Sequence, residues 1–328
     1  MQDDLLVLNV IGFQGILRYQ VKLQGSSLTA EEKDPILSSS DPNFRPADIE
    51  MGPDGAMYLV DWQNPIIGHM QHNLRDPSRD QVHGRVYRVT YEGRPLAKMP
   101  SMDKLSIEQL CSQLESPVNR TRYLAKLEMT GRDSTKVLEG VARWWKGLDR
   151  NDPNYEHHRL EALWMHQQHD QIDLPLLDQV LNSPEPRARA AAVTVLWAWR
   201  DRVPDVLSRL LKAATDDHGL VRLEAVRAAS YLEQPEAIEV SVIARQKEVD
   251  PYLDYVLKET DRVLMPRWKS ALDSNLPLKM TTDAGRRFYL QQLSTEKLLT
   301  MEPSVAVFEE LMLRPGVQDG VRTEAIQR

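Results

Sequence analysis

An arginine placed three residues before an alanine recurs along residues 101–328 of this chain. The first four of these arginines are separated by intervals of 37, 30 and 33 residues. This spacing is typical of helical repeats, which bury their apolar faces only by stacking on one another. Residues 101–328 are therefore predicted to form an array of antiparallel helix pairs. The arginines are Arg122, Arg159, Arg189 and Arg222, with a further copy expected at Arg322.

The repeated segments share positions beyond the arginine. Ser116 and Ser183 each precede a proline and lie six residues before a repeat arginine, which predicts a turn before the helix. Val221 and Val321 stand directly before later repeat arginines. These segments resemble HEAT or Armadillo-like repeats, in which a turn leads into a Val-Arg-x-x-Ala helix, and the resemblance implies an α-solenoid. Between residues 265 and 300 the pattern weakens, so irregular helices are expected there.

Apolar residues within the predicted helices indicate where the core lies. Residues 176–181 and 192–196 carry apolar side chains at helical spacing on two consecutive helices. These faces are predicted to pack together. Five tryptophans also recur at helical positions and are predicted to be core residues rather than ligand stackers. They are Trp144, Trp145, Trp164, Trp197 and Trp199.

Residues 1–100 have a different pattern, in which short apolar runs alternate with turn residues. This pattern indicates β-strands. The clearest turn is residues 52–55, because Pro53 fixes φ at the first turn position and Gly55 tolerates a positive φ. Five strands without a helix are not expected to close a sheet of their own. The predicted strands are residues 5–10, 16–23, 47–51, 56–61 and 85–91.

Composition argues against several kinds of function. The 41 basic and 48 acidic residues give a formal net charge of −7, without a clustered basic run, so nucleic acid is not an expected partner. No run of 18 apolar residues is present to span a membrane. Cys111 is the only cysteine, which excludes an internal disulfide and a Cys-x-x-Cys pair. Its helical position predicts a small buried apolar residue.

Residues 45–62 and 83–89, together with the loop 64–72, contain several unusual strings in one order. They resemble the last blade of a bacterial family of membrane-bound dehydrogenases, whose β-propeller is similar to that of soluble quinoprotein glucose/sorbosone dehydrogenases. Longer members continue into HEAT repeats and a c-type cytochrome domain. The implied fold is a partial β-propeller over residues 1–100, followed by a HEAT/Armadillo-like α-solenoid over residues 101–328. We expect the chain to be a piece of a larger protein, cut at both ends.

The resemblance implies an oxidoreductase. In the complete protein, a sugar or related alcohol would be oxidised with a quinone-type cofactor, PQQ with Ca²⁺, and the electrons would pass to haem c in a domain outside this chain. The implied location is the periplasm or the cell surface, and this piece alone is expected to be inactive. The alternative is a non-catalytic scaffold that binds a protein or a polysaccharide, because propellers and helical repeats commonly serve as binding platforms.

The segment between residues 63 and 84 is long for a connection between antiparallel strands, and long ordered loops are often functional. His69 and His72 lie three residues apart, where one helical turn would align them as candidate catalytic bases for an alcohol. Asn64 and Arg75 are candidates for cofactor binding, since an arginine can hold a carboxylate. The candidate metal ligands are Asp61, Asp76, Asp80 and His83.

A structural role is the alternative for the same segment. Asp61 and Asn64 would then bond backbone amides, while Arg75 would pair with Asp76 or Asp80.

Two further motifs lie in the helical part. His166 and His169 are either metal ligands or residues of a solvated helix end. Asp250, which is followed by Pro251, is predicted to cap the start of a helix.

Overall fold

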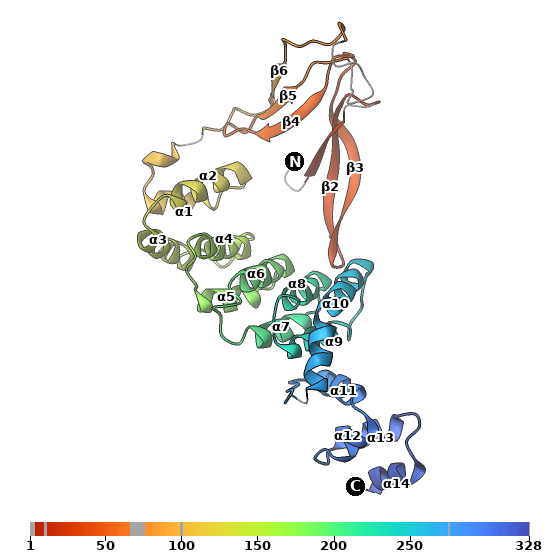
Figure 1. The fold of residues 1–328 in the computed structure, drawn as a ribbon. Helices are drawn as coiled ribbons and strands as arrows, with labels where there is room; N and C mark the ends of the chain where they lie inside the picture. The colour runs from red at the N-terminus through yellow and green to blue at the C-terminus, as the bar shows by residue number, and fades with distance from the viewer. Residues whose placement is uncertain (1–3, 10–11, 66–75, 99–100, 275, 328) are drawn as a thin grey trace. The chain divides into compact units, whose positions relative to one another are not determined.

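The structure is a computed structural model that describes residues 4–9, 12–65, 76–98, 101–274 and 276–327. The chain divides into two compact units, one of residues 1–24 with 28–173 and the other of residues 25–27 with 174–328. Strands give way to helices near residue 100 (Figure 1). The predicted order, β followed by α, is therefore confirmed.

Two antiparallel sheets of three strands each lie in the first unit, in the orders β1-β2-β3 and β4-β5-β6. All five predicted strands are present, with ends shifted by one or two residues. The strand that the sequence did not indicate is β3, because most of its side chains are exposed and it has no buried alternation. The strands are β1 (Asp4–Asn9), β2 (Gly15–Gln24), β3 (Ser27–Ser38), β4 (Pro46–Met51), β5 (Met57–Asp61) and β6 (Arg85–Val89).

One small core joins the two sheets. Ile16 of β2 packs in the same buried cluster as Phe44 and as Met57 and Leu59 of β5. The predicted turn between β4 and β5 is confirmed, since the N–H of Gly52 donates to the carbonyl of Ala56 across 2.8 Å. The strands that the structure describes do not close into a barrel or a propeller.

Fourteen α-helices fill the described part of the chain beyond residue 101, with single 3-10 turns at Met102–Lys104 and Pro235–Ala237. In the first unit they are α1 (Ile107–Gln113), α2 (Asn119–Thr130), α3 (Ser134–Lys146) and α4 (Tyr155–Gln168). In the second unit they are α5 (Leu174–Leu181), α6 (Pro186–Ala198), α7 (Val206–Ala214), α8 (Gly219–Ala229), α9 (Ile238–Ala244), α10 (Pro251–Asp273), α11 (Asp283–Gln292), α12 (Thr295–Leu299), α13 (Val305–Leu313) and α14 (Asp319–Gln327).

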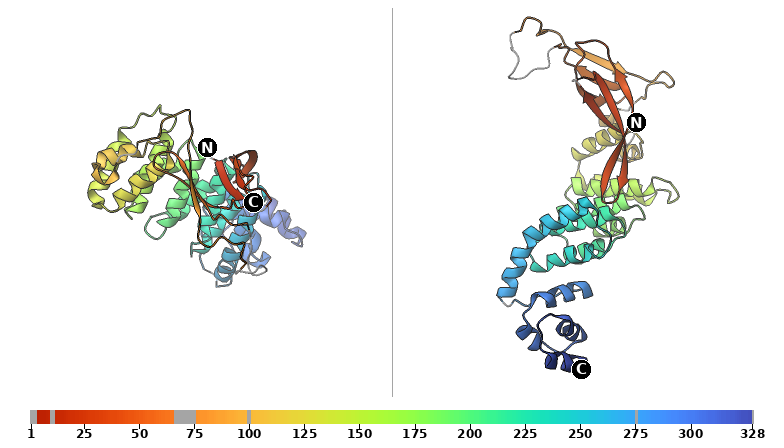
Figure 2. Two further views of the ribbon diagram at one scale, coloured as in Figure 1. Left: turned by 90° about the horizontal axis from the view of Figure 1, so that it is seen from above. Right: turned by 90° about the vertical axis from the view of Figure 1, so that its right-hand side faces the viewer.

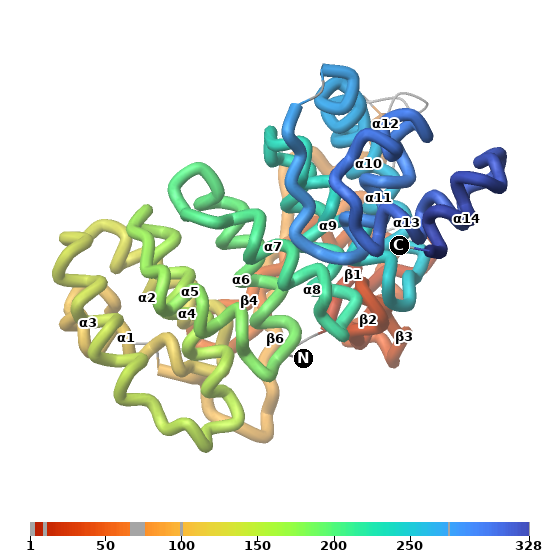
Figure 3. The backbone as a smooth tube through the Cα atoms, turned by 90° about the horizontal axis from the view of Figure 1, so that it is seen from below, coloured from red at the N-terminus to blue at the C-terminus, as the bar shows by residue number. Residues whose placement is uncertain are grey.

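Helices of the second unit pack as consecutive pairs. The second helices of these pairs, α6, α8 and α10, contact one another in order, and α6 and α8 lie side by side in Figure 3. The predicted shared core is confirmed, because Leu176, Leu177 and Val180 of α5 and Val193 and Leu196 of α6 have no exposed surface. None of the described helices is both long and apolar enough to cross a lipid bilayer.

Local signals set the limits of α10. Its cap is Asp250, whose carboxylate accepts from the N–H groups of Tyr252 and Leu253, as predicted. The irregularity expected after residue 265 does not begin there, because the helix continues past the exposed Pro266 to Asp273 (light blue in the right-hand view of Figure 2). Proline removes one helical hydrogen bond, and at an exposed position water replaces the lost donor.

Three of the repeat arginines connect neighbouring repeats. Each is the fourth residue of its helix and donates back to a carbonyl in the preceding turn. Arg122 of α2 also reaches Glu161 of α4 at 3.1 Å. Arg189 of α6 reaches Asp216 before α8, and Arg222 of α8 reaches the carbonyl of Glu248 before α10. These inter-repeat contacts explain the recurrence seen in the sequence.

Arg159 differs from these three, although its spacing predicted an equivalent role. It is the fifth residue of α4 rather than the fourth. Its guanidinium pairs with Glu156 one turn earlier on the same helix and lies 5.4 Å from the ring of Tyr155. A shift of one residue turns a helical side chain by about 100°. Arg159 therefore does not occupy the position from which the other three arginines contact the neighbouring repeat.

Candidate functional site

A pocket of about 590 Å³ lies where the sequence predicted a functional loop, between β5 and β6. The residues that line it are Trp62, Asn64, Arg79, Asp80, Gln81, Val82, His83 and Gly84. Its composition combines an exposed tryptophan with amide, carboxylate and imidazole groups. Such a lining suits a polar organic ligand rather than a purely apolar one.

Asp61 ends β5 and holds the start of the loop in place. Its buried Oδ1 accepts from the backbone N–H of Arg45 at 2.7 Å and from that of Gln63 at 2.8 Å. Its Oδ2 accepts from Nε of Arg85 at 2.6 Å, while Nη1 of Arg85 donates to Asp41 at 2.7 Å. The hydrogen bonds to Asp41 and then Asp61 raise the pKa of Arg85. Asp61 thus makes the backbone contacts that the structural alternative predicted, together with an ion pair.

Asp80 and His83 form the chemically distinctive pair in the pocket. The carboxylate accepts from the backbone N–H groups of Val82 and His83, which lower the pKa of Asp80. Nδ1 of His83 lies 3.0 Å from Oδ2 of Asp80. An ionised carboxylate can only accept, so Nδ1 of His83 is the donor in this contact. An imidazole that is neutral and donates from Nδ1 has Nε2 as its basic atom.

Of the other predicted site residues, Asn64 joins this pair in the pocket, Asp76 makes separate contacts, and three are not described. Asn64 is buried and its Nδ2 donates to the carbonyl of Asp80 at 3.4 Å. Asp76 accepts from the backbone N–H and the hydroxyl of Ser78. His69, His72 and Arg75 lie outside the described residues.

Metal binding at this loop stays a prediction. Of the four proposed ligands, the structure brings Asp80 and His83 together, whereas Asp61 faces Arg85 and Asp76 faces Ser78. Within the described ranges, no group of three or more His, Cys, Asp or Glu side chains converges as a metal site.

His166 near the end of α4 is buried and His169, which follows the helix, is partly buried, so the reading of a solvated helix end is wrong for His166. His166 is 8% exposed, and its Nε2 lies 3.6 Å from the carboxylate of Asp173. His169 contacts the hydroxyl of Ser134 at 3.0 Å. Cys111 is buried as predicted, and burial raises its pKa to about 12. This thiol is therefore not a nucleophile at neutral pH.

A surface on α6 and α8 was not anticipated. Trp197 was predicted to be a core residue, but its ring is contacted by the guanidinium groups of Arg200 and Arg227 and by the ring of Tyr231. The sequence signal that could have revealed it is the spacing of Arg227 and Tyr231 by four residues, which aligns them on one helix face beside the preceding repeat.

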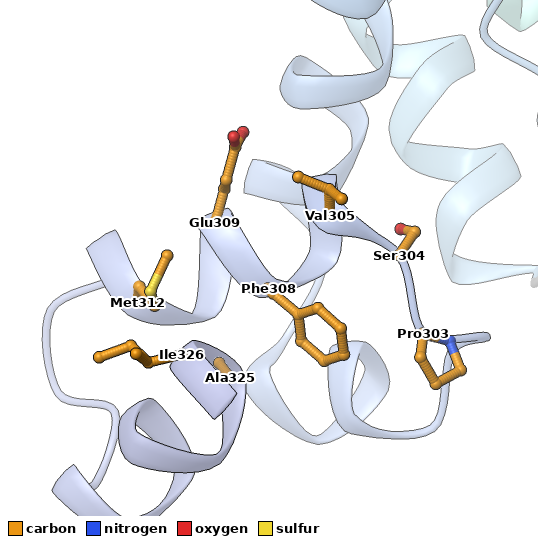
Figure 4. A pocket seen from close by; sticks show the side chains of 8 residues that line it. All are labelled: Pro303, Ser304, Val305, Phe308, Glu309, Met312, Ala325 and Ile326. Atoms are coloured by element: carbon orange, nitrogen blue, oxygen red, sulfur yellow. The ribbon is translucent and has the colours of Figure 1, made fainter. Parts of the chain in front are cut away.

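An apolar pocket of about 620 Å³ lies against α13 and α14 in the second unit. Figure 4 shows Phe308 and Met312 of α13 and Ile326 of α14 among the side chains that line it. The remaining lining residues are Pro303, Ser304, Val305, Glu309 and Ala325. Glu309 is the one ionisable residue in this lining, so the pocket offers packing rather than acid–base chemistry.

Comparison with known proteins separates the two parts of the chain. Residues 7–93 match the model of a domain of unknown function (DUF7133). Residues 174–253 match the model of HEAT repeats, in agreement with the repeat predicted from the arginines. No curated protein and no solved structure gives a significant match. The comparisons thus support helical repeats and give no evidence for a quinoprotein dehydrogenase family.

Proposed function

We propose that this chain is a scaffold whose helical repeats hold a protein partner. The observation that carries the proposal is the HEAT-repeat match over residues 174–253, which runs from α5 to the first turn of α10. Repeats of this kind often present extended surfaces to other proteins.

The inter-repeat arginines support a platform role because they restrict movement between helix pairs. Arg189 bonds Ser183 in its own turn and Asp216 in the next repeat. Arg222, which is almost fully buried, donates to the backbone carbonyl of Asp216 in its own turn and to that of Glu248 before α10. A surface that is already ordered loses less conformational entropy when a partner binds.

Cross-linking of the purified chain in extract from the cells that produce it tests the proposal. A lysine-reactive reagent followed by mass spectrometry should join a partner to Lys212 on α7 or Lys258 on α10. Lys22 and Lys33 on the β-strands serve as the internal comparison. Partner cross-links confined to these two strand lysines would contradict a scaffold built on the helical repeats.

The two sheets fit a further part of this proposal, namely that they belong to a β-propeller. Each sheet joins antiparallel strands in sequence order, which is also the way in which a propeller blade is built. Strands from an open ring leave edges exposed. Residues 1–100 expressed alone should therefore aggregate or stay unstructured, whereas a monomeric, cooperatively melting β domain would contradict the propeller.

Oxidation of a sugar or related alcohol is a second candidate, which the Asp80–His83 pair favours. If the His83 imidazole is neutral and donates from Nδ1 to Asp80, its Nε2 can act as a general base for a hydroxyl group. Trp62 and Asn64 line the same pocket. PQQ with Ca²⁺ would act as the electron acceptor. Equilibrium dialysis of the complete protein that the dehydrogenase resemblance implies, with PQQ and Ca²⁺, tests this candidate, and the absence of uptake would remove it.

A further inference from the structure

We infer that the surface around Trp197 binds an acidic polypeptide segment that also carries aromatic side chains. The inference rests on the proposed scaffold function and specifies the chemistry of the partner. We name this surface the Trp197 cluster, and its members are Trp197, Arg200, Arg227 and Tyr231.

The cluster spans two neighbouring repeats of the second unit. Trp197 lies near the end of α6 and Arg200 follows it, whereas Arg227 lies on α8 and Tyr231 follows that helix. The guanidinium carbon of Arg227 is 4.9 Å from the centre of the Trp197 ring. That of Arg200 is 5.7 Å from the rings of both Trp197 and Tyr231. The two aromatic rings meet edge to face at 5.2 Å.

Three cation–π contacts within residues 197–231 share the two aromatic rings of the cluster. Tryptophan, tyrosine and arginine are also the residue types that contribute most to binding at protein interfaces. Within the cluster, Tyr231 is 51% exposed, so one face or edge of its ring is open to a further aromatic group.

The two arginines are not equally engaged. Arg227 donates from Nε and Nη2 to Glu224 at 2.8 Å, which satisfies its charge within α8. Arg200 donates from Nη1 to the carbonyl of Trp197 at 3.1 Å. Its Nη2 lies 3.6 Å from the carboxylate of Asp201, which is too far for a hydrogen bond.

Arg200 is therefore the arginine of the cluster to which a carboxylate of the partner would bind most strongly. A guanidinium has five N–H donors in a fixed plane and binds carboxylates in a bidentate manner. Its side chain is 28% exposed, whereas that of Asp201 is 81% exposed, so the existing pair is largely screened by water. A glutamate or aspartate of the partner would bind Arg200, and an adjacent aromatic ring would pack against Tyr231.

Nucleic acid is a poorer fit for the same surface. Phosphate backbones are bound by several clustered cations, but in this cluster Arg227 is neutralised by Glu224. The chain also has a formal net charge of −7. A short acidic peptide needs a single well-placed guanidinium beside an aromatic surface, and the cluster provides that arrangement.

The test uses the whole chain and a fluorescent random copolymer of glutamate and tyrosine, with binding followed by anisotropy at physiological salt. Arg200→Gln should weaken binding about tenfold, since it removes a charged hydrogen bond. Arg200→Lys keeps the charge but not the bidentate geometry, so its affinity for the copolymer should lie between those of the unmodified chain and Arg200→Gln. Polyglutamate without tyrosine should bind more weakly than the copolymer.

Arg262→Gln is the matched control, because Arg262 is an exposed arginine on α10 that pairs with Glu259 at 2.7 Å. It should bind the copolymer within twofold of the unmodified chain. Circular dichroism melting checks that each variant is folded. Equal loss in the Arg200 and Arg262 variants, unchanged binding by Arg200→Gln, or tighter binding of an oligouridine RNA than of the copolymer would each overturn the inference.

The outcomes also separate this inference from the scaffold proposal. In one outcome a partner cross-links to the helices in extract but the chain does not bind the copolymer. That outcome would overturn the inference of an acidic partner segment and leave the scaffold proposal standing. Arg200-dependent copolymer binding without any cross-linked partner would leave the surface chemistry standing and count against the scaffold.

Discussion

Arg189 of α6 and Asp216 before α8 form a bidentate ion pair, with N–O distances of 2.7 and 2.8 Å. Burial raises the pKa of Asp216, but the hydrogen bonds from Arg189 and from the backbone N–H of His218 outweigh burial and keep the pKa below its usual value. The pair therefore stabilises the folded state at neutral pH. That contribution is complete above the unfolded pKa of 3.8 and is lost as the pH falls through the lower folded value.

Replacement of Arg189 by alanine should destabilise the second unit. The change leaves a largely buried Asp216 without its cation and the carbonyl of Ser183 without a donor. The free energy of unfolding should fall by about 2 to 3 kcal/mol, as measured by urea denaturation followed by circular dichroism. Arg187→Ala is the control, because that side chain is 68% exposed and should change stability by less than about 0.5 kcal/mol. Similar losses of stability in the two variants would argue against a stabilising contact between Arg189 and Asp216.

Gly285 of α11 is expected to be intolerant of a side chain. Glu239 of α9 is fully buried and accepts from the backbone N–H groups of Thr281 and Thr282 at 3.0 and 2.6 Å. A Cβ at Gly285 would overlap this carboxylate. Gly285→Ala should cost about 2 kcal/mol and speed hydrogen exchange in α11.

Gly147→Ala provides the comparison, because a Cβ there meets nothing closer than 3.5 Å. Unaltered exchange in α11 of the Gly285 variant would show that Glu239 is not a fixed anchor.

Mild acid should destabilise the first unit through histidines in α4 and directly after it. Burial lowers the pKa of His166 despite the opposing charge of Asp173, and burial also lowers the pKa values of His158 and His169. The unfolded chain takes up protons near pH 6.5, before the folded chain does. The free energy of unfolding should therefore fall as the pH is lowered from 7.5 to 5.5.

Thermal melting across this pH range measures the effect. His166→Gln should give a smaller decline than the unmodified chain, because one buried titrating group is gone. His83→Gln is the control, since the His83 side chain is 72% exposed. A decline that is the same with and without His166 would assign the pH dependence to other groups.

Asp61→Asn should loosen the candidate loop site. The amide retains one oxygen for the N–H groups of Arg45 and Gln63, but it places an NH₂ group against Nε of Arg85. The expected cost is about 2 to 3 kcal/mol, seen as faster hydrogen exchange in β5 and β6. Asp48→Asn, at an exposed position that accepts from the N–H of Ile49, should leave exchange unchanged. Protection of β5 and β6 that survives Asp61→Asn would rule out this anchoring role.

Sequence patterns predicted the elements well wherever burial repeats at a regular interval. The hairpin of β4 and β5 was recognisable from its turn at residues 52–55, because neighbouring residues alone determine such a turn. β3 escaped prediction because most of its side chains face solvent. The repeat arginines were found by spacing, although spacing did not distinguish Arg159 from the three that join neighbouring repeats.

The candidate loop was located from its length and polar residues, but its internal contacts were not. The sequence suggested a common metal role for Asp61 and Asp80, whereas the fold pairs one with Arg85 and the other with His83. Strand register decides this difference, since Arg85 stands opposite Asp61 in the β5–β6 ladder. The dehydrogenase activity, its cofactors and its location stay predictions.

The sequence by itself therefore determined that strands precede helical repeats, and where most of these elements lie. The tertiary structure alone decided that Trp197 meets Arg227 and Tyr231 from the next repeat. The physical reason is the separation along the chain of the residues that determine each feature. Helical and strand periodicity follow from residues within one or two turns, whereas the contact between two helices depends on the rotation of each about its own axis.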